Sequence, residues 1–152
     1  FSLSLKTLNQ PFIKKHQYSD LSVLTHYNEV AKFGKSHAAY IENQCVGFIL
    51  AEVQEWNSTL VVREFGVHPE YRRQHIGQKL IFKAIEDARA ASLRCVFCET
   101  QNTNVDAIEF YKKQGFVIDG IDLAFYDSES DQQTEVAVFL RKKISKNREN
   151  IR

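Results

Sequence analysis

The chain has 152 residues, enough for one domain with a buried core, and its 43% hydrophobic and 26% charged residues are typical of a soluble globular protein. A formal net charge of +1 gives no field over the whole molecule that would attract nucleic acid or an acidic membrane, and no apolar run is long enough to cross a bilayer, so we expect neither partner. The odd set of cysteines, Cys45, Cys95 and Cys98, fits a reducing compartment, which predicts a cytoplasmic protein.

The first part of the chain is predicted to form a helix and a β-hairpin. Apolar residues mixed with polar ones up to Phe33 indicate the helix. Within residues 37–53, two apolar runs flank a polar turn at 42–44, which is the pattern of a hairpin. A further turn at 56–58 leads into a strand predicted over residues 60–67.

The strongest local pattern is that of a helix over Gly77–Ser92. Its charged residues mostly lie away from one apolar face, which carries Leu80, Ile81, Ala84, Ile85, Ala88 and Ala91. A strand over Cys95–Thr100 follows, and then a short helix over Asn104–Gln114 that Gly115 would end. Strand, helix and strand in this order predict a right-handed crossover.

The remaining residues are predicted to complete the sheet. Phe116–Ile121 has a strand pattern, and Leu123–Asp127 and Thr134–Leu140 are predicted to be the arms of a final hairpin. Residues 141–152 are polar and basic, which predicts a solvated tail. We therefore expect a single α/β domain over residues 1–140, with a mixed twisted sheet and helices on both faces, followed by that tail.

The most informative segment joins the strand that ends at Val67 to the helix that begins near Gly77. Backbone N–H groups in the first turn of a helix lack internal partners, and the helix dipole makes that end positive, so an anion can bind there. Arg72, Arg73 and Lys79 add positive charge, and Gly77 removes a side chain where a ligand would approach closely. Residues 72–79 are predicted to hold a pyrophosphate. The wider set of predicted cofactor-binding residues in this segment is Phe65, Gly66, Val67, Arg72, Arg73, Gln74, His75, Ile76, Gly77, Gln78 and Lys79.

This segment resembles motif A of the GNAT acetyltransferases, Q/R-x-x-G-x-G/A, with Arg72 in its first position and Gly77 in its last. His75 stands where the first glycine belongs, so it keeps the backbone amide but lacks the freedom of glycine to adopt positive φ. A second segment, residues 104–116, fills every position of the family pattern N-x-x-A-x-x-F-Y-x-x-x-G-F. Within the family, residues 99–102 and 120–126 look most like streptothricin acetyltransferases.

The resemblance implies a fold, a cosubstrate and a reaction. The sheet is expected to splay between the strands at 60–67 and 95–100 to admit acetyl-CoA, and the acetyl group would pass directly to a primary amine without a covalent acetyl-enzyme. A small cationic acceptor such as streptothricin is the expected substrate. The alternatives are a protein N-terminus or lysine as the acceptor, or a CoA-binding regulatory module without turnover. Because family members often pair through sheet edges, the resemblance also implies a homodimer.

The resemblance suggests catalytic residues as well. Glu64 stands where related enzymes carry an acidic residue that faces the acceptor amine, and it would act as a general base; the alternative is an ion pair with Arg63 or with a lysine on a neighbouring strand. Tyr111 matches the tyrosine that protonates the departing CoA thiolate; the alternative is a core aromatic residue. Val67 would offer its backbone N–H to the thioester carbonyl.

Three further residues are candidates for binding. Asn104 is expected to hydrogen-bond the pantetheine arm, to cap the short helix, or to do both. Asp122 and Tyr126 match the D-x-x-x-Y of streptothricin acetyltransferases and are expected to contact the acceptor. Cys95 and Cys98 have zinc-like spacing, but positions three apart on a strand face opposite sides, so no metal site is predicted.

Overall fold

The structure, a computed structural model, describes residues 21–126 and 135–144. Its helices are α1 (Leu21–Phe33), α2 (Ile76–Ala90) and α3 (Val105–Lys113), and its strands are β1 (His37–Ile41), β2 (Gln44–Gln54), β3 (Thr59–Val67), β4 (Cys95–Gln101), β5 (Val117–Asp122) and β6 (Ala137–Lys143). Short 3-10 turns at Glu55–Asn57 and Pro69–Tyr71 flank β3. No helix among these residues is long and apolar enough to cross a membrane.

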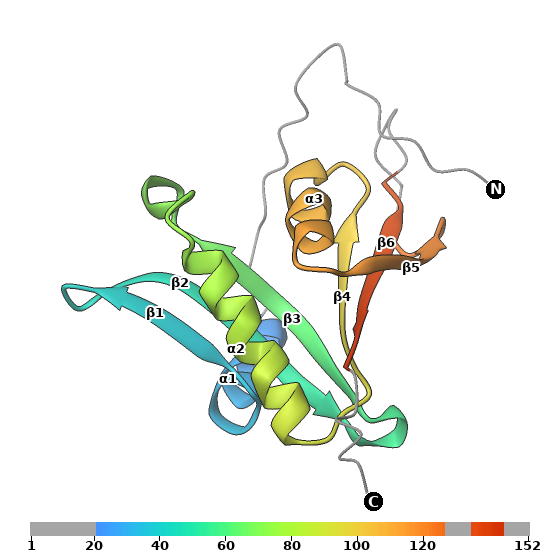
Figure 1. Cartoon of the computed structure of the whole chain (residues 1–152), viewed down its shortest axis with the longest axis horizontal. Coiled ribbons are helices and arrows are strands. Elements are labelled where there is room, and N and C mark those ends of the chain that lie inside the picture. Colours follow the sequence, from blue (N-terminus) through green and yellow to red (C-terminus); the bar gives the residue numbers. More distant parts are fainter. Residues whose placement is uncertain (1–20, 127–134, 145–152) are drawn as a thin grey trace, which may run out of the picture.

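The strands form one mixed sheet in the order β1-β2-β3-β4-β6-β5. The pair β3 and β4 is parallel, with α2 as its crossover, and the other neighbouring strands are antiparallel. Figure 1 shows α2 across the front of β1–β3 and α1 behind the same strands. The predicted α/β fold, with a mixed sheet and helices on both faces, is confirmed.

The sheet opens between its two parallel strands. Pairing between β3 and β4 begins at Thr59 with Cys95 and ends at Val62 with Cys98, although both strands continue beyond these residues. Figure 1 shows β3 and β4 diverging from the end where they are paired. The expected splay is therefore confirmed, and it leaves the later part of β3 with a neighbour on one side.

A β-bulge lies at the point where the strands separate. Leu50 of β2 lies opposite Glu64, whereas Ala51 lies opposite Val62, so Arg63 is an extra residue in β3. A bulge bends its strand and increases the local twist. Since Arg63 directly follows the last residue paired with β4, we infer that the bulge turns β3 away from β4.

Helix α2 fixes this arrangement through its apolar face. Leu80, Ile81, Ala84, Ile85 and Ala88 are buried and pack in one cluster with side chains of β2, β3, β4 and β6. Ala91, which was predicted to lie on this face, is instead the exposed residue that ends the helix, so that assignment was wrong. The helix ends there because Ser92 adopts a positive φ of 55°, and the N–H groups of Ser92 and Leu93 turn back to the carbonyls of Arg89 and Ala88.

The predicted turns and short helices are largely confirmed. Glu42 and Asn43 both have positive φ, 47° and 67°, as expected for the two-residue turn of a tight hairpin. Gly115 ends α3 with a φ of 82°, in the left-handed region that glycine adopts readily. Lys142 occupies the space beside it, because a Cβ added at Gly115 would lie 2.7 Å from Lys142 Nζ.

The C-terminal hairpin differs from the prediction. Strand β6 pairs with β5, and residues 123–126 form bends rather than a strand; Asp127 and Thr134 lie outside the described residues. The strand stops because Asp122 Oδ1 accepts a hydrogen bond from Ala124 N–H at 2.9 Å, a turn that competes with the sheet ladder. The predicted boundary at residue 140 was also wrong, because β6 continues to Lys143 and Ile144 is buried.

We expect Gly34→Ala to destabilise the protein by about 1–3 kcal/mol, the usual cost of overpacking. An added Cβ at Gly34 would lie 2.3 Å from Ala51 O and 2.5 Å from Val30 O, and backbone atoms cannot rotate away as a side chain can. Gly120→Ala is the matched control, because its Cβ would meet Phe139 at an ordinary 3.5 Å. Urea denaturation of both variants measures the difference, and equal stability would contradict the packing described at Gly34.

Candidate active site

The segment that is predicted to bind an anion lies at the junction of β3 and α2. Among the described residues, no carbonyl accepts a hydrogen bond from the backbone N–H groups of residues 73–75, and the side chain of His75 does not cap the helix. The first amides of α2, at residues 76–78, also lack helical partners, as at any helix start. This run of free N–H groups at a positive helix end suits a pyrophosphate.

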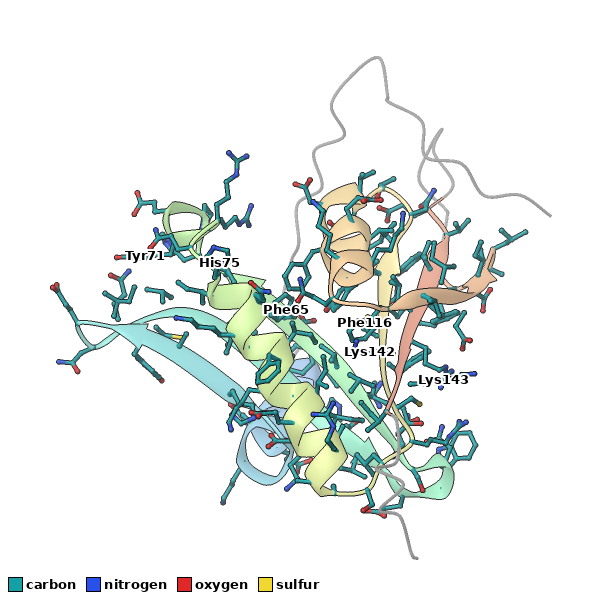
Figure 2. All side chains as sticks on the ribbon, viewed as in Figure 1. Phe65, Tyr71, His75, Phe116, Lys142 and Lys143 are labelled. Carbon is teal, nitrogen blue, oxygen red and sulfur yellow. The ribbon has the colours of Figure 1, made fainter. Side chains whose placement is uncertain are left out.

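His75 adopts the conformation that the family glycine would supply. Both Arg73 and His75 have φ of 61°, in the left-handed region. Among residues with a side chain, histidine is one of those found there more often than average. The expectation that His75 would resist positive φ was therefore wrong. The residue keeps the backbone shape of the cradle, which we define as residues 72–79, and Figure 2 shows it at the N-terminal end of α2.

Several polar side chains surround the cradle. Arg72 Nε donates to Val67 O at 3.2 Å, His75 Nδ1 lies 3.0 Å from Gln78 Oε1, and Gln74 Nε2 donates to Glu70 O at 3.4 Å. The side chains of residues 72–75, Gln78 and Lys79 are exposed and can reach a bound anion. The cradle therefore combines free amides with nearby cations, a combination that can bind an anion.

Gly77 has a different role from the one expected. A Cβ added at Gly77 would lie 3.2 Å from Phe65 and 3.5 Å from both Phe110 and Val67, so its bare side faces the protein interior. Phe65 and Phe110 stack there with their ring centroids 5.3 Å apart. The absence of a side chain at Gly77 thus lets the start of α2 approach this aromatic pair, rather than making room for a ligand.

The open edge of β3 presents backbone groups to the gap. His68 N–H donates to Val46 O at 2.9 Å, and residues along an antiparallel strand alternate in the direction of their N–H and C=O groups. The backbone of Val67 therefore points away from β2, toward the side where β4 has diverged. Its N–H is available to a ligand in the gap, consistent with the predicted contact to a thioester carbonyl.

Tyr111 lies at the fork where β3 and β4 separate. Its side chain is buried, and its hydroxyl interacts with the thiol of Cys98, the last residue of β4 that pairs with β3. Burial raises the pKa of Tyr111 well above 10.0, and the neighbouring Cys98 and the charge of Glu64 raise it further. The phenol is therefore protonated at neutral pH, the state that an acid requires.

Glu64 reaches the same fork from the opposite face of the sheet. Phe65 faces the core beside α3, so alternation places Glu64 and Gly66 on the α1 face. There Tyr27 of α1 donates a hydrogen bond to Glu64 Oε1 at 2.5 Å. The alternative ion pair with Arg63 is not formed, because Arg63 pairs with Glu52 instead. Tyr27 was not predicted as a site residue, since no local pattern reveals a contact between residues 37 positions apart.

The predicted binding residues lie at the ends of neighbouring elements. Asn104 caps α3, with its Oδ1 accepting from Ala107 N at 3.3 Å, so the capping role is confirmed. Asp122 forms the turn after β5. Tyr126 donates its hydroxyl to Glu99 Oε1. Burial raises the pKa of Tyr126, and the hydrogen bond to Glu99 raises it further.

Glu99 is a site residue that the sequence analysis did not single out. Cys98 faces the core, so strand alternation places Glu99 on the α1 face, the face that also carries Glu64. The alternation of β4 could have indicated from the sequence which face carries Glu99. The hydrogen bond from Tyr126 could not be predicted in this way, because Tyr126 is distant in the chain. Among the described residues, no group of three or more His, Cys, Asp or Glu side chains could hold a metal ion.

Comparisons with known proteins agree with this geometry. The model of the acetyltransferase (GNAT) family matches residues 4–116. Streptothricin acetyltransferase A of Bacillus subtilis (strain 168) is 31% identical over 132 residues, which cover 86% of this chain and 73% of that protein. Streptothricin acetyltransferase of Streptomyces lavendulae is 29% identical over 91 residues, 60% of this chain and 48% of that protein.

A solved structure supports both the fold and the cosubstrate. A candidate streptothricin acetyltransferase from Bacillus anthracis strain Ames, in complex with acetyl coenzyme A, is 32% identical, with a TM-score of 0.71, and the match covers 78% of this chain and 68% of that one. The chain therefore belongs to the GNAT family of acetyltransferases. Acetyl-CoA is its cosubstrate, and the free amides of the cradle and the open edge of β3 fit that molecule.

The buried groups at the fork predict how stability depends on pH. The pKa values of Cys98 and Tyr111 rise on folding from ordinary values of 9.0 and 10.0, so above about pH 9 the unfolded chain releases protons that the folded chain keeps. We expect the free energy of unfolding to fall as pH rises above 9, by up to about 1.4 kcal/mol per pH unit for each group.

Urea denaturation between about pH 8 and pH 11 measures this dependence. Cys98→Ala and Tyr111→Phe should each make the decline shallower, because each removes one group that titrates only when the chain unfolds. A free energy of unfolding that stays constant over this range would show that the fork is more accessible to water than the structure indicates.

Proposed function

We propose that this protein transfers the acetyl group of acetyl-CoA to a primary amine of a small cationic acceptor similar to streptothricin. The observation that carries the proposal is the approach of Glu64 and Tyr111 to one fork in the sheet, beside the open edge of β3. One group accepts a proton and the other can donate one. The attack of an amine on a thioester needs both a group that accepts the proton of the amine and a group that donates a proton to the departing thiolate.

Glu64 acts as the general base in this proposal. The acceptor enters as an ammonium, and its proton passes to Glu64, directly or through water, so that the nitrogen gains a free electron pair. The hydrogen bond from Tyr27 holds one carboxylate oxygen, Oε1, and leaves Oε2 to face the amine. Tyr27 thereby orients the carboxylate.

Val67 and Tyr111 stabilise the charges that develop on the thioester. As the amine nitrogen bonds to the carbonyl carbon, the Val67 N–H donates to the oxygen that becomes negative. When the carbon–sulfur bond breaks, the phenol of Tyr111 donates its proton to the departing thiolate. The raised pKa of Tyr111 keeps that proton available over the whole neutral range.

The acceptor side of the fork is acidic. Glu64 and Glu99 lie on the same face of adjacent strands, Tyr126 hydrogen-bonds Glu99, and the charge of Glu135 contributes to the raised pKa of Tyr126. Carboxylates on this face would attract an amine that carries more than one positive charge. This observation, together with the names of the relatives that are about 30% identical, favours a small cationic acceptor over a protein N-terminus.

The proposal predicts one product from a panel of amines. We expect the purified protein, incubated with acetyl-CoA and streptothricin, aminoglycosides, polyamines or lysine peptides, to add a single acetyl group to streptothricin, detected by mass spectrometry. Acetylation of peptides alone would favour the alternative protein substrate. CoA binding without a product from any of these amines would favour the regulatory module.

Substitutions at the fork test the catalytic assignments. Glu64→Gln and Tyr111→Phe should each lower kcat by about 10²-fold to 10⁴-fold, the usual contribution of a general base or acid, while the affinity for CoA stays the same. Steady-state kinetics and equilibrium CoA binding separate the two effects. Glu55→Gln and Tyr40→Phe, at exposed positions away from the fork, are the matched controls. Unchanged turnover in Glu64→Gln or Tyr111→Phe would remove that residue from the mechanism.

A further inference from the structure

Four aromatic rings gather on the α1 face of the sheet, beside Glu99. Phe97 lies two positions before Glu99 on β4 and shares its face, and Phe139 of β6 is the direct cross-strand partner of Glu99. The rings of Phe97 and Phe139 stack with their centroids 5.6 Å apart and their planes at 18°. Phe125, in the bend after β5, meets Phe139 at 5.6 Å and Tyr126 at 5.2 Å, both at 84°. These four side chains form one ring cluster.

One end of the ring cluster already binds a cation of the protein itself. The guanidinium carbon of Arg141 lies over the ring of Phe97, 4.9 Å from its centroid, and Arg141 Nε donates to Asp119 Oδ2 at 2.5 Å. A cation is attracted to the face of an aromatic ring when it lies within about 6 Å of the centroid. A ring and a carboxylate therefore hold a positive group together at this end of the cluster.

The other end of the ring cluster offers the same combination of a ring and a carboxylate. Tyr126 donates its hydroxyl to Glu99, so that carboxylate lies beside the pair formed by Phe125 and Tyr126. Phe125 is 52% exposed, whereas Phe97 and Phe139 are half-buried. A ligand can therefore reach this end of the cluster more easily than the end that Arg141 occupies.

The half of the α1 face that carries the ring cluster is not covered by a helix of the described residues. Figure 1 shows α1 behind β1–β3, whereas no described helix lies behind β4, β6 and β5. Exposure of apolar rings to water is unfavourable, and contiguous exposed apolar surface often marks a binding site. Because Glu64 and Glu99 share this face, the surface suits a positively charged ligand better than a neutral apolar one.

We propose that Glu99 and the exposed ring of Phe125 bind a second positive group of the acceptor while its reacting amine lies at Glu64. The inference rests on the proposed function, and it narrows the acceptor to molecules that carry at least two positive groups. The second group would lie against the face of Phe125, and the carboxylate of Glu99 would accept its hydrogen bond. Tyr126 orients Glu99 in this site, as Tyr27 orients Glu64 at the fork.

The divergence of β3 and β4 sets a lower limit on the spacing of the two positive groups. Neighbouring strands lie about 4.8 Å apart where they are paired, and the pairing of β3 with β4 ends at Val62 and Cys98. Glu64 and Glu99 both lie beyond that point. Positive groups bound to both carboxylates are therefore expected to be at least about 5 Å apart, a distance that the chain of 1,5-diaminopentane can span.

The test is equilibrium binding of 1,5-diaminopentane and of 1-aminopentane, which lacks only the second amine, by NMR titration of the protein saturated with CoA. We expect the diamine to bind at least about tenfold more tightly, the usual effect of a hydrogen bond to a charged group. Phe125→Leu should reduce this preference by about twofold to fivefold, the range of an exposed cation–π contact. Glu99→Gln should remove most of it. Because Phe125 is exposed, Phe125→Leu keeps the test valid if Glu99→Gln does not fold.

Phe82→Leu is the matched control, because it makes the same substitution at a phenylalanine of α2 that is similarly exposed, at 56%, on the other side of the sheet; it should keep the full preference. Equal affinity of the unaltered protein for the two amines, or no binding of the diamine, would overturn the inference and leave acetyl transfer intact. A preference that falls as much in Phe82→Leu as in Phe125→Leu would also overturn it. Amines that bind with this preference but are not acetylated would instead contradict the proposed function.

Discussion

The end of pairing between β3 and β4 is the constraint on which the site depends. Up to Val62 and Cys98 the two strands satisfy each other's backbone groups, and beyond these residues they do not. The bulge at Arg63 bends β3 at that point, and the aromatic pair of Phe65 and Phe110 fills the space beneath the start of α2. The free edge of β3 is therefore held open by packing, and it leaves backbone N–H groups for a ligand that resembles an extended strand.

The same fork divides the molecule electrostatically. On one side lie the amides of the cradle with the cations Arg72, Arg73 and Lys79, and on the other face lie Glu64 and Glu99. The net charge of +1 conceals this division, because 20 basic and 19 acidic residues nearly cancel over the whole chain. In the proposed function, the anionic cosubstrate and a cationic acceptor would approach from different faces and meet at Tyr111.

The sequence predicted most of what depends on local pattern. Helix α2, the first hairpin, the splay and the cradle all follow from spacing or from the family motifs. The contacts of Tyr27 with Glu64 and of Tyr126 with Glu99 could not be predicted, because they join elements that only the fold brings together. The final hairpin was predicted wrongly for a related reason: Leu123–Asp127 and β5 are both plausible partners for β6, and the turn at Asp122 decides between them.

His75 shows the limit of reading a motif residue by residue. The histidine lacks the freedom of glycine, yet its φ of 61° preserves the backbone of the cradle at an intrinsic cost of about 1–2 kcal/mol. The function of the motif depends on amide positions rather than on glycine itself. For this reason the substitution does not by itself argue against CoA binding.

A crystal structure of the protein with acetyl-CoA would show directly whether the thioester binds at the fork. We expect the thioester to lie in the gap between β3 and β4, with its carbonyl oxygen about 2.7–3.1 Å from Val67 N and its sulfur beside the hydroxyl of Tyr111. A thioester bound elsewhere, or one that contacts neither group, would contradict this expectation.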